Sequence, residues 1–274
     1  MSTMMIKRAE TLGVPWRAQV AELKQRDWQP ALTAIADPSI TYPDYYLNSF
    51  HAYEEGNLGW EPALEVESAS YTVHSTLFGT PTITGDERLR QSYHQLLEHH
   101  VTPSPYQILD LGCGVGLSTQ ALQRSFPQAQ VTGLDLSPYF LAVAQYRTQD
   151  EIPPLQWLHA PAEATGLPDR SVDLISCCLI FHELPRSAAL AIFQEARRIL
   201  KPGGYFAIMD MNPRSEAFSK MPPYILTLLK STEPYLDQYF SLDISQELQA
   251  LGFTEPFVGT NTPRHRTIIC SLNP

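Results

Sequence analysis

Ile108-Leu-Asp-Leu-Gly-Cys-Gly-Val-Gly116 is the stretch of sequence that decides the fold. An apolar run that is typical of a buried strand ends in three glycines at alternate positions, and a helical pattern follows. Gly112 permits a tight turn, Gly114 lets a ligand approach the backbone, and Gly116 brings the helix close against the strand. The stretch therefore predicts the first strand, turn and helix of a ligand-binding α/β sheet.

Outward from this stretch, short apolar runs alternate with segments of helical period, which indicates repeated βα units around a mostly parallel sheet. Two further strands, joined by a short turn, close the chain as an antiparallel hairpin. We therefore expect a doubly wound, Rossmann-like sheet of seven strands, over residues 107–111, 131–135, 155–158, 172–180, 205–211, 256–261 and 265–270.

Residues 1–100 lack this alternation. Trp16, Val20 and Leu23 predict one helix, and Leu89, Tyr93 and Leu97 predict another. An unusually aromatic stretch, 42–60, lies between them. We expect a mainly helical cap over 1–100 and a ligand-binding domain over 101–274, in which Pro222-Pro223 opens a lid segment at 221–240.

The composition excludes several classes of partner. The 274 residues carry 19 Lys and Arg against 29 Asp and Glu, a formal net charge of -10, so a nucleic-acid partner is not expected. The four cysteines have no CxxC spacing, and there is no signal peptide and no apolar run long enough to span a bilayer. We expect a cytoplasmic protein without membrane insertion; the oligomeric state stays open.

The glycine stretch fits two kinds of cofactor site. A nicotinamide dinucleotide site favours GxGxxG, whose third glycine lets a helix approach a pyrophosphate, but Leu117 occupies that position. Asp135 follows about 20 residues later and suits ribose hydroxyls in either class. The pattern of an acidic residue before GxGxG resembles motif one of the class I S-adenosylmethionine-dependent methyltransferases, which disfavours an NAD(P)-dependent oxidoreductase.

The resemblance continues through residues 159–175 (HAPAEATGLPDRSVDLI) and 197–206 (RRILKPGGYF), which are similar to UbiE-like, type 11 methyltransferases. Other segments resemble a poorly characterised cyanobacterial and plastid group. The resemblance implies S-adenosylmethionine as cofactor and S-adenosylhomocysteine as product, with Asp110 near the methionine ammonium; the family's usual aspartate is replaced by Pro161. The implied cofactor-binding residues are Asp110, Gly112, Cys113, Gly114, Gly116, Asp135, Leu136, Ala162, Glu163 and Cys177.

The acceptor side is less constrained. His182, just after the central strand, is our candidate for a general base that is neutral at cellular pH, with Glu183 as the neighbouring alternative. The aromatic residues predict a small apolar or aromatic acceptor methylated on oxygen or carbon; a protein methyltransferase and a non-catalytic cofactor-binding partner are the alternatives. No metal is expected, because a catechol-type site needs a carboxylate after strand four. The candidate acceptor-binding residues are Tyr45, Tyr46, His51, Tyr53 and Tyr224.

Overall fold

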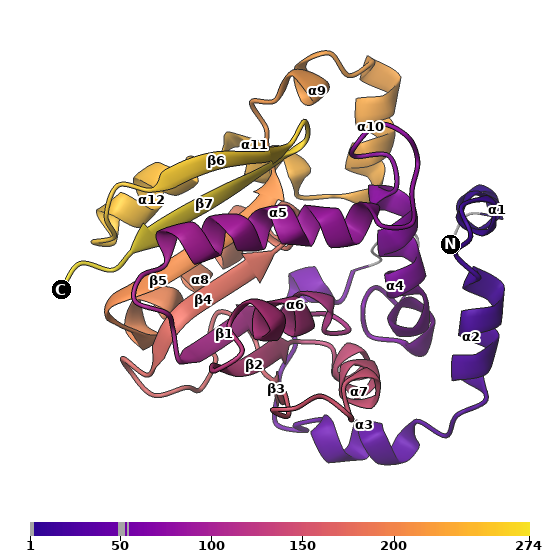
Figure 1. Cartoon of the computed structure of the whole chain (residues 1–274), viewed down its shortest axis with the longest axis horizontal. Helices are drawn as coiled ribbons and strands as arrows, with labels where there is room; N and C mark the ends of the chain where they lie inside the picture. Colours follow the sequence, from indigo (N-terminus) through magenta and orange to yellow (C-terminus); the bar gives the residue numbers. More distant parts are fainter. Residues whose placement is uncertain (1–2, 49–52, 54) are drawn as a thin grey trace.

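The computed structural model describes residues 3–48, 53 and 55–274. At its centre lies a seven-stranded sheet in the order β3-β2-β1-β4-β5-β7-β6 (Figure 1). The strands are β1 (Gln107–Leu111), β2 (Gln130–Asp135), β3 (Gln156–His159), β4 (Val172–Cys178), β5 (Leu200–Met211), β6 (Phe257–Thr262) and β7 (His265–Ser271). The first five are parallel, and β7 runs antiparallel to both β5 and β6. The predicted mostly parallel sheet with a closing hairpin is confirmed.

The central strand β4 is shorter than its apolar run suggested. It pairs with β1 on one edge and β5 on the other, and the two cores on opposite faces of the sheet bury both of its faces. We expected it to continue to residue 180, but Leu179 has a φ of 63°, which breaks the extended conformation. The chain turns there into the short 3-10 helix η2 (Phe181–Glu183). This turn places residues 179–183 at the carboxyl edge of the sheet.

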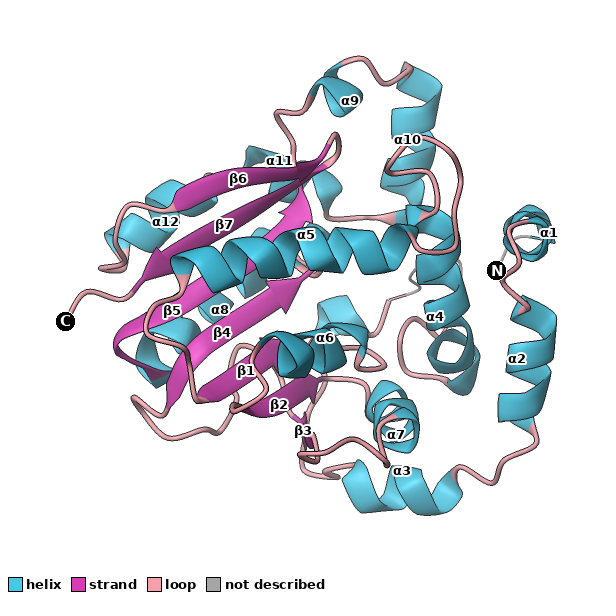
Figure 2. Cartoon of the chain, in the orientation of Figure 1, coloured by secondary structure: helices cyan, strands magenta, loops and turns pink. Residues whose placement is uncertain are grey.

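Helices cover both faces of the sheet, as a doubly wound fold requires (Figure 2). On one face, α5 (Gly85–His100) and α6 (Leu117–Ser125) enclose a core that includes Ile108, Leu174 and Ala207. On the other face, α8 (Arg186–Ile199) and α12 (Ile244–Ala250) enclose a second core. Alternate residues of each strand supply the two cores because successive side chains point to opposite faces.

The N-terminal helices wrap around the end of the molecule beside α7 (Pro138–Arg147) (Figure 1). They are α1 (Thr3–Thr11), α2 (Trp16–Lys24), α3 (Gln29–Ile35), η1 (Asp44–Tyr46) and α4 (Trp60–His74). The helices predicted from Trp16 and from Leu89 are present. Helix α4 was not predicted, because its buried residues include Glu65, Ser68 and Thr72 and so give no apolar stripe.

Three short helices connect β5 to α12: α9 (Glu216–Ser219), α10 (Pro223–Thr232) and α11 (Leu236–Ser241). Helix α10 begins at Pro223, as the double proline predicted, and none of its residues is buried. In the described part of the chain, no helix combines the length and the apolarity needed to cross a membrane.

Candidate active site

A cavity of about 1090 Å³ opens at the carboxyl ends of β1, β2 and β4. In the sheet, β2 lies on one side of β1 and β4 lies on the other, so the direction of the strand order reverses at β1. Doubly wound folds bind ligands at the carboxyl end of such a topological switch point. The volume lies just above the range of about 300–1,000 Å³ that small-molecule sites occupy. The cavity therefore has room for two ligands side by side.

The glycine turn forms one end of this cavity. The amide nitrogens of Gly112 and Cys113 donate to the carbonyl of Leu134, 2.8 and 3.0 Å away, which fixes the turn against β2. Gly114 has a φ of +54°, and a Cβ atom placed there would meet nothing within 4 Å. The backbone at Gly114 therefore borders open space, which a ligand can approach closely.

Gly116 was also expected to contact the cofactor, but it does not line the cavity. A Cβ atom at Gly116 would lie 2.6 Å from the ring of Trp157 on β3, and one at Gly133 on β2 would lie 2.5 Å from the same ring. Gly116 permits the packing of Trp157 against the start of α6, where its own φ is +84°, which is the close approach of helix and strand that was expected of it.

Asp135, at the end of β2, presents a buried carboxylate to the cavity. Oδ2 accepts a hydrogen bond from the amide of Gly114 and Oδ1 accepts one from the amide of Ser137, both at 2.8 Å. Burial raises the pKa of Asp135 to about 6, against the lowering effect of these amides. The Leu136 backbone and the Tyr46 hydroxyl also lower this pKa by hydrogen bonding, so the carboxylate is held firmly by the groups around it.

Asp110 is buried behind the cavity and does not line it. Its Oδ2 accepts hydrogen bonds from the hydroxyls of Ser118 and Thr119, at 2.6 and 2.7 Å, whereas Oδ1 is buried with no hydrogen-bond partner among the described residues. Burial raises the pKa of Asp110 to about 6. Ser118 does line the cavity, so it stands between Asp110 and any ligand.

The expected cofactor contact at Cys177 is wrong by one residue. Cys177 points into the core beneath α8, while Cys178 points to the opposite face and lines the cavity. Adjacent residues of a strand face opposite sides of a sheet, and the sequence does not reveal which of two adjacent cysteines faces which side.

His182 lines the cavity from η2 and is bound to Asp210 on β5. Its Nδ1 lies 2.7 Å from Oδ1 of Asp210. Burial alone lowers the pKa of His182, but the Asp210 carboxylate, with smaller effects of Glu183 and Glu233, raises it to about 10. The Asp210 carboxylate therefore favours the imidazolium form of His182 rather than the neutral form that we expected, and an imidazolium has no lone pair to accept a proton.

Three tyrosines of the N-terminal segment line the cavity. The hydroxyl of Tyr45 donates to the Glu163 carboxylate, and the Tyr53 hydroxyl donates to Glu65 at 2.7 Å. Burial, followed by the charge of Glu163, raises the pKa of Tyr45. Tyr46 stacks on Tyr42, with the ring planes 10° apart. Each of the three tyrosines is therefore fixed by polar or ring contacts, and Tyr45 and Tyr46 reach groups at or after strand ends, Glu163 and Asp135.

The structure brings most of the predicted residues together. Those that line the cavity are Gly112, Cys113, Gly114, Asp135, Leu136, Ala162, Glu163, Tyr45, Tyr46, Tyr53, His182 and Glu183. Tyr224 does not line it; its side chain is 72% exposed on the outer side of α10, whereas Ile225, Leu228 and Leu229 of the same helix do line it. His51 lies outside the described residues.

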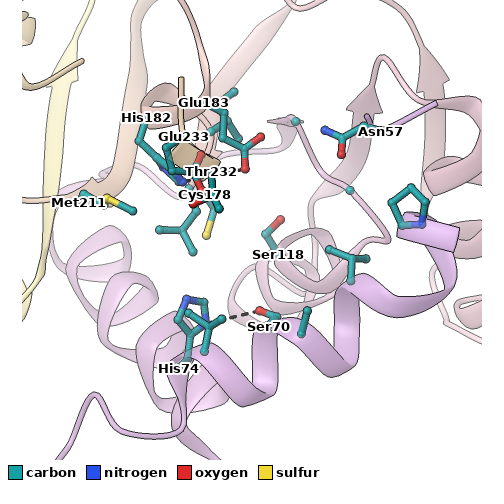
Figure 3. Close-up of a pocket in the computed structure, with 18 of the residues that line it drawn as sticks. Asn57, Ser70, His74, Ser118, Cys178, His182, Glu183, Met211, Thr232 and Glu233 are labelled. Atoms are coloured by element: carbon teal, nitrogen blue, oxygen red, sulfur yellow. Dashed lines mark hydrogen bonds and ion pairs between the residues drawn. The ribbon is translucent and has the colours of Figure 1, made fainter. Parts of the chain in front are cut away.

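Sequence reasoning missed the opposite wall of the cavity. Ser70 and His74 of α4 face the cavity across from Cys178, His182 and Glu183 (Figure 3). The sequence of α4 offered one weak signal of this wall, which is the number of polar residues, such as Ser70 and His74, among its apolar ones. The apolar side chains of this part of the cavity, the apolar lobe, are Met4, Met5, Val66, Ala69, Val73, Leu77, Phe218, Met221, Ile225 and Leu228.

Comparison with known proteins gives consistent matches. Residues 109–208 match a family model described as a methyltransferase domain. An uncharacterized methyltransferase of Synechocystis sp. is 32% identical over 176 residues, which cover 64% of this chain and 78% of that protein. A trans-aconitate 2-methyltransferase of Methylobacterium radiotolerans is 38% identical over 123 residues, 45% of this chain and 44% of that enzyme. The chain therefore spans less than half of this second relative.

Among solved structures, human N-acetylserotonin methyltransferase in complex with SAM superposes with a TM-score of 0.60. The superposition covers 98% of this chain and 70% of the human one, at 14% sequence identity. At that identity the likeness is one of fold.

Proposed function

The chain belongs to the class I S-adenosylmethionine-dependent methyltransferases, and from this premise we propose that it methylates an oxygen or carbon atom of a small apolar or aromatic acceptor. The cofactor occupies the end of the cavity at the glycine turn, and the acceptor occupies the apolar lobe. The cap over 1–100 and the lid over 221–240 supply the walls of that lobe.

The observation that carries the proposal is the pairing of Gly114 with Asp135. The glycine backbone borders open space, and its amide orients a buried carboxylate that faces the same space. A carboxylate in this place accepts both hydroxyls of a ribose, while the missing Cβ allows close approach of the ligand.

Asp110 acts on the cofactor through Ser118. The Ser118 hydroxyl donates its proton to Asp110, so its oxygen lone pairs are free to accept a hydrogen bond from an ammonium group in the cavity. The charge of Asp110 favours a cation on that side, and its unpartnered Oδ1 adds to this field. Leu136, Ala162 and Glu163 line the cavity where the adenine is expected, with Tyr45 holding Glu163 in place.

When bound, the cofactor supplies a methyl group on a cationic sulfur that is already a good leaving group. The protein therefore has to position the acceptor and exclude water. The apolar lobe does both, because its Met, Val, Leu and Ile side chains bury an apolar acceptor and offer water few partners. The trans-aconitate relative supports a small-molecule acceptor.

Calorimetric titration of the purified protein with S-adenosylhomocysteine and, separately, with NAD tests the cofactor assignment. We expect binding of the first and none of the second. Asp135→Ala should abolish binding, whereas Asp150→Ala, an exposed aspartate, should not alter it. Transfer of labelled methyl from S-adenosylmethionine to a low-molecular-weight fraction of an extract of the encoding organism tests the acceptor; label that appears only in protein contradicts a small-molecule acceptor.

A further inference from the structure

Two histidines face the cavity from opposite walls, and each is held by an aspartate. His182 Nδ1 lies 2.7 Å from Asp210 Oδ1, and His74 Nδ1 lies 2.6 Å from Asp86 Oδ1 (Figure 3 shows the two histidines). The two pairs differ in whether a second cation neutralises the charge of the aspartate. That difference decides which histidine can be neutral and accept a proton.

In the His74 pair, an arginine already balances the aspartate. Arg90 Nε lies 2.8 Å from Oδ2 of Asp86, and its Nη2 lies 3.3 Å from Oδ1. The Ser70 hydroxyl donates to Oδ1 as well, at 2.6 Å. Although burial opposes this, the charge of Arg90 and, after it, the hydrogen bond with His74 hold the pKa of Asp86 well below its ordinary value. The Asp86 carboxylate is thus ionised and paired with a permanent cation.

In the His182 pair, the histidine itself is the balancing cation. Asp210 accepts backbone hydrogen bonds from Phe181 and Met211, at 2.8 and 2.7 Å. Within the described residues, the ion pair that the structure gives Asp210 is the one with His182. A proton on His182 is therefore needed to neutralise this buried carboxylate, whereas Asp86 needs no proton on His74.

The hydrogen bonds of His74 fix its tautomer. Both hydrogen-bonding contacts that the structure gives its ring, to Asp86 and to Ser70, are made by Nδ1. Nδ1 therefore carries the proton that Asp86 accepts, and in a neutral ring the lone pair is on Nε2. His74 lines the cavity, and Nε2 is the ring nitrogen that its hydrogen bonds leave for a ligand there.

The His74 pair is also connected to the edge of the sheet where the cofactor site begins. Nη1 of Arg90 lies 3.4 Å from Sγ of Cys178, the last residue of β4. Asp86 and Arg90 belong to α5, so this helix links His74 at the end of α4 to the end of β4. His74 lines the same cavity, on the side where we propose that the acceptor binds.

A second histidine lies near His74. The His265 ring on β7 lies 6.0 Å from that of His74, and burial lowers the pKa of His265 to about 3, so it is uncharged. The remaining charged residues that line the cavity are Arg8, Arg90, Asp135, Glu163, Glu183, Glu233 and Arg264, together with the imidazolium of His182.

We propose that His74 is the base of the methyl transfer and that the acceptor carries a phenolic or enolic hydroxyl; this inference rests on the proposed methyltransferase function. As the acceptor oxygen forms its bond to the methyl carbon, the bond from that carbon to sulfur breaks and sulfur keeps the electron pair. The hydroxyl proton passes to Nε2 of His74, and Asp86 stabilises the resulting imidazolium. That proton later leaves to water. Asp86 and Arg90 are positioning residues.

The first arm of the test compares His74→Gln, Asp86→Asn and the exposed control His99→Gln. Each variant is checked for S-adenosylhomocysteine binding and then for transfer of tritiated methyl from S-adenosylmethionine to a low-molecular-weight extract. A general base contributes about a hundred- to ten-thousand-fold, so His74→Gln should lose kcat by that order and keep its cofactor affinity. Its residual rate should rise with pH, because an acceptor that ionises by itself needs no base.

The second arm uses the wild-type protein and needs no acceptor. Nitrogen-15 NMR of labelled histidines, with S-adenosylhomocysteine bound, should show His74 neutral at pH 7.5 with its proton on Nδ1, and His182 doubly protonated. The His74 signals are assigned by their loss in His74→Gln, or in His74→Asn if the first variant does not fold.

The two proposals fail in different ways. A wild-type protein that binds cofactor and labels no small molecule contradicts the proposed function, whereas labelling that His74→Gln retains within a factor of two overturns the role of His74. A doubly protonated His74, or one with its proton on Nε2, also overturns that role, whatever the turnover.

Discussion

The amide nitrogen of Gly114 lies 2.8 Å from Oδ2 of Asp135. This contact joins the turn after β1 to the end of β2, so the two neighbouring strands present one continuous surface to the cavity. It also orients the carboxylate, since Ser137 holds the other oxygen at the same distance. The proposed cofactor end of the site is thus built from the backbone as much as from side chains.

Gly114→Ala should weaken S-adenosylhomocysteine binding at least tenfold and cost only modest stability. A Cβ atom at Gly114 would enter the open space that the cofactor is proposed to fill, and the φ of +54° adds strain of about 1–2 kcal/mol. Gly166→Ala is a matched control, because Gly166 has a φ of +72°, an equally open surrounding and no place in the cavity lining. Calorimetry and thermal melts measure both. Equal loss of affinity in the two variants would contradict the cofactor placement.

Gly133→Ala should reduce the free energy of unfolding by about 1–3 kcal/mol, as overpacking does. The added Cβ atom would lie 2.5 Å from the Trp157 ring and 2.9 Å from Sγ of Cys113. Urea unfolding measures the loss, and Trp157→Leu in the same protein should recover part of it. If the double variant is less stable than the sum of the single ones, the ring is not the source of the clash.

Protein stability should depend on pH through His182. The pKa of His182 rises from 6.5 to about 10 on folding, because the Asp210 carboxylate outweighs the effect of burial. Its contribution is fully present below pH 6.5 and is lost as the pH rises toward 10. Between these values the free energy of unfolding should fall more steeply in the wild type than in His182→Gln or Asp210→Asn. Parallel curves in urea titrations at several pH values would rule out the imidazolium.

Cofactor binding should weaken as the pH falls below about 6. Burial raises the pKa of Asp135 to about 6, and the ribose hydroxyls are proposed to donate to its ionised form. The affinity for S-adenosylhomocysteine should therefore fall on acidification in the wild type and stay nearly flat in Asp135→Asn. Asp110 has a similarly raised pKa, so Asp110→Asn is the control that should keep the acid dependence due to Asp135. A flat wild-type profile would contradict the ribose role.

Ile225→Asn should raise the KM for the acceptor and leave cofactor affinity unchanged. Ile225 lines the apolar lobe from α10 but is 37% exposed, so the polar side chain does little to the fold. Its neighbour Tyr224, 72% exposed and outside the cavity, gives the control Tyr224→Ala. Methyl-transfer kinetics on the labelled acceptor distinguish them. A KM that rises only in the Tyr224 variant would place the acceptor on the outer side of α10.

The order and type of most sheet elements could be predicted from the sequence because their patterns are local. The first strand ends at Leu111 and the double proline opens α10, both as expected. Helix α4 escaped prediction because two polar residues that it buries, Glu65 and Ser68, have hydrogen-bond partners outside the helix, Tyr53 and Gln19. A pattern of hydrophobic residues does not record such tertiary hydrogen bonds.

The candidate site was predictable to the extent that it lies in the glycine turn and at strand ends. The site predictions that the structure corrected concern residues whose surroundings are supplied by parts of the chain that are distant in sequence. The charge of His182 follows from Asp210, 28 residues away, and the hydroxyl contacts of Asp110 show that it lies behind Ser118. The choice between Cys177 and Cys178 depends on strand register, which adjacent identical residues do not reveal.

The proposed cofactor end of the cavity is built from the middle of the chain, whereas the proposed acceptor end is built from segments on both sides of it. The glycine turn and Asp135 lie within residues 112–135, while the apolar lobe is lined from α1 and α4 before them and from the segment between β5 and α11 after them. Substitutions in these two flanking segments are therefore expected to change acceptor preference while leaving the glycine turn and Asp135 in place. A chimera that takes both flanking segments from one homologue and the sheet from another should combine the acceptor preference of the first with the cofactor site of the second.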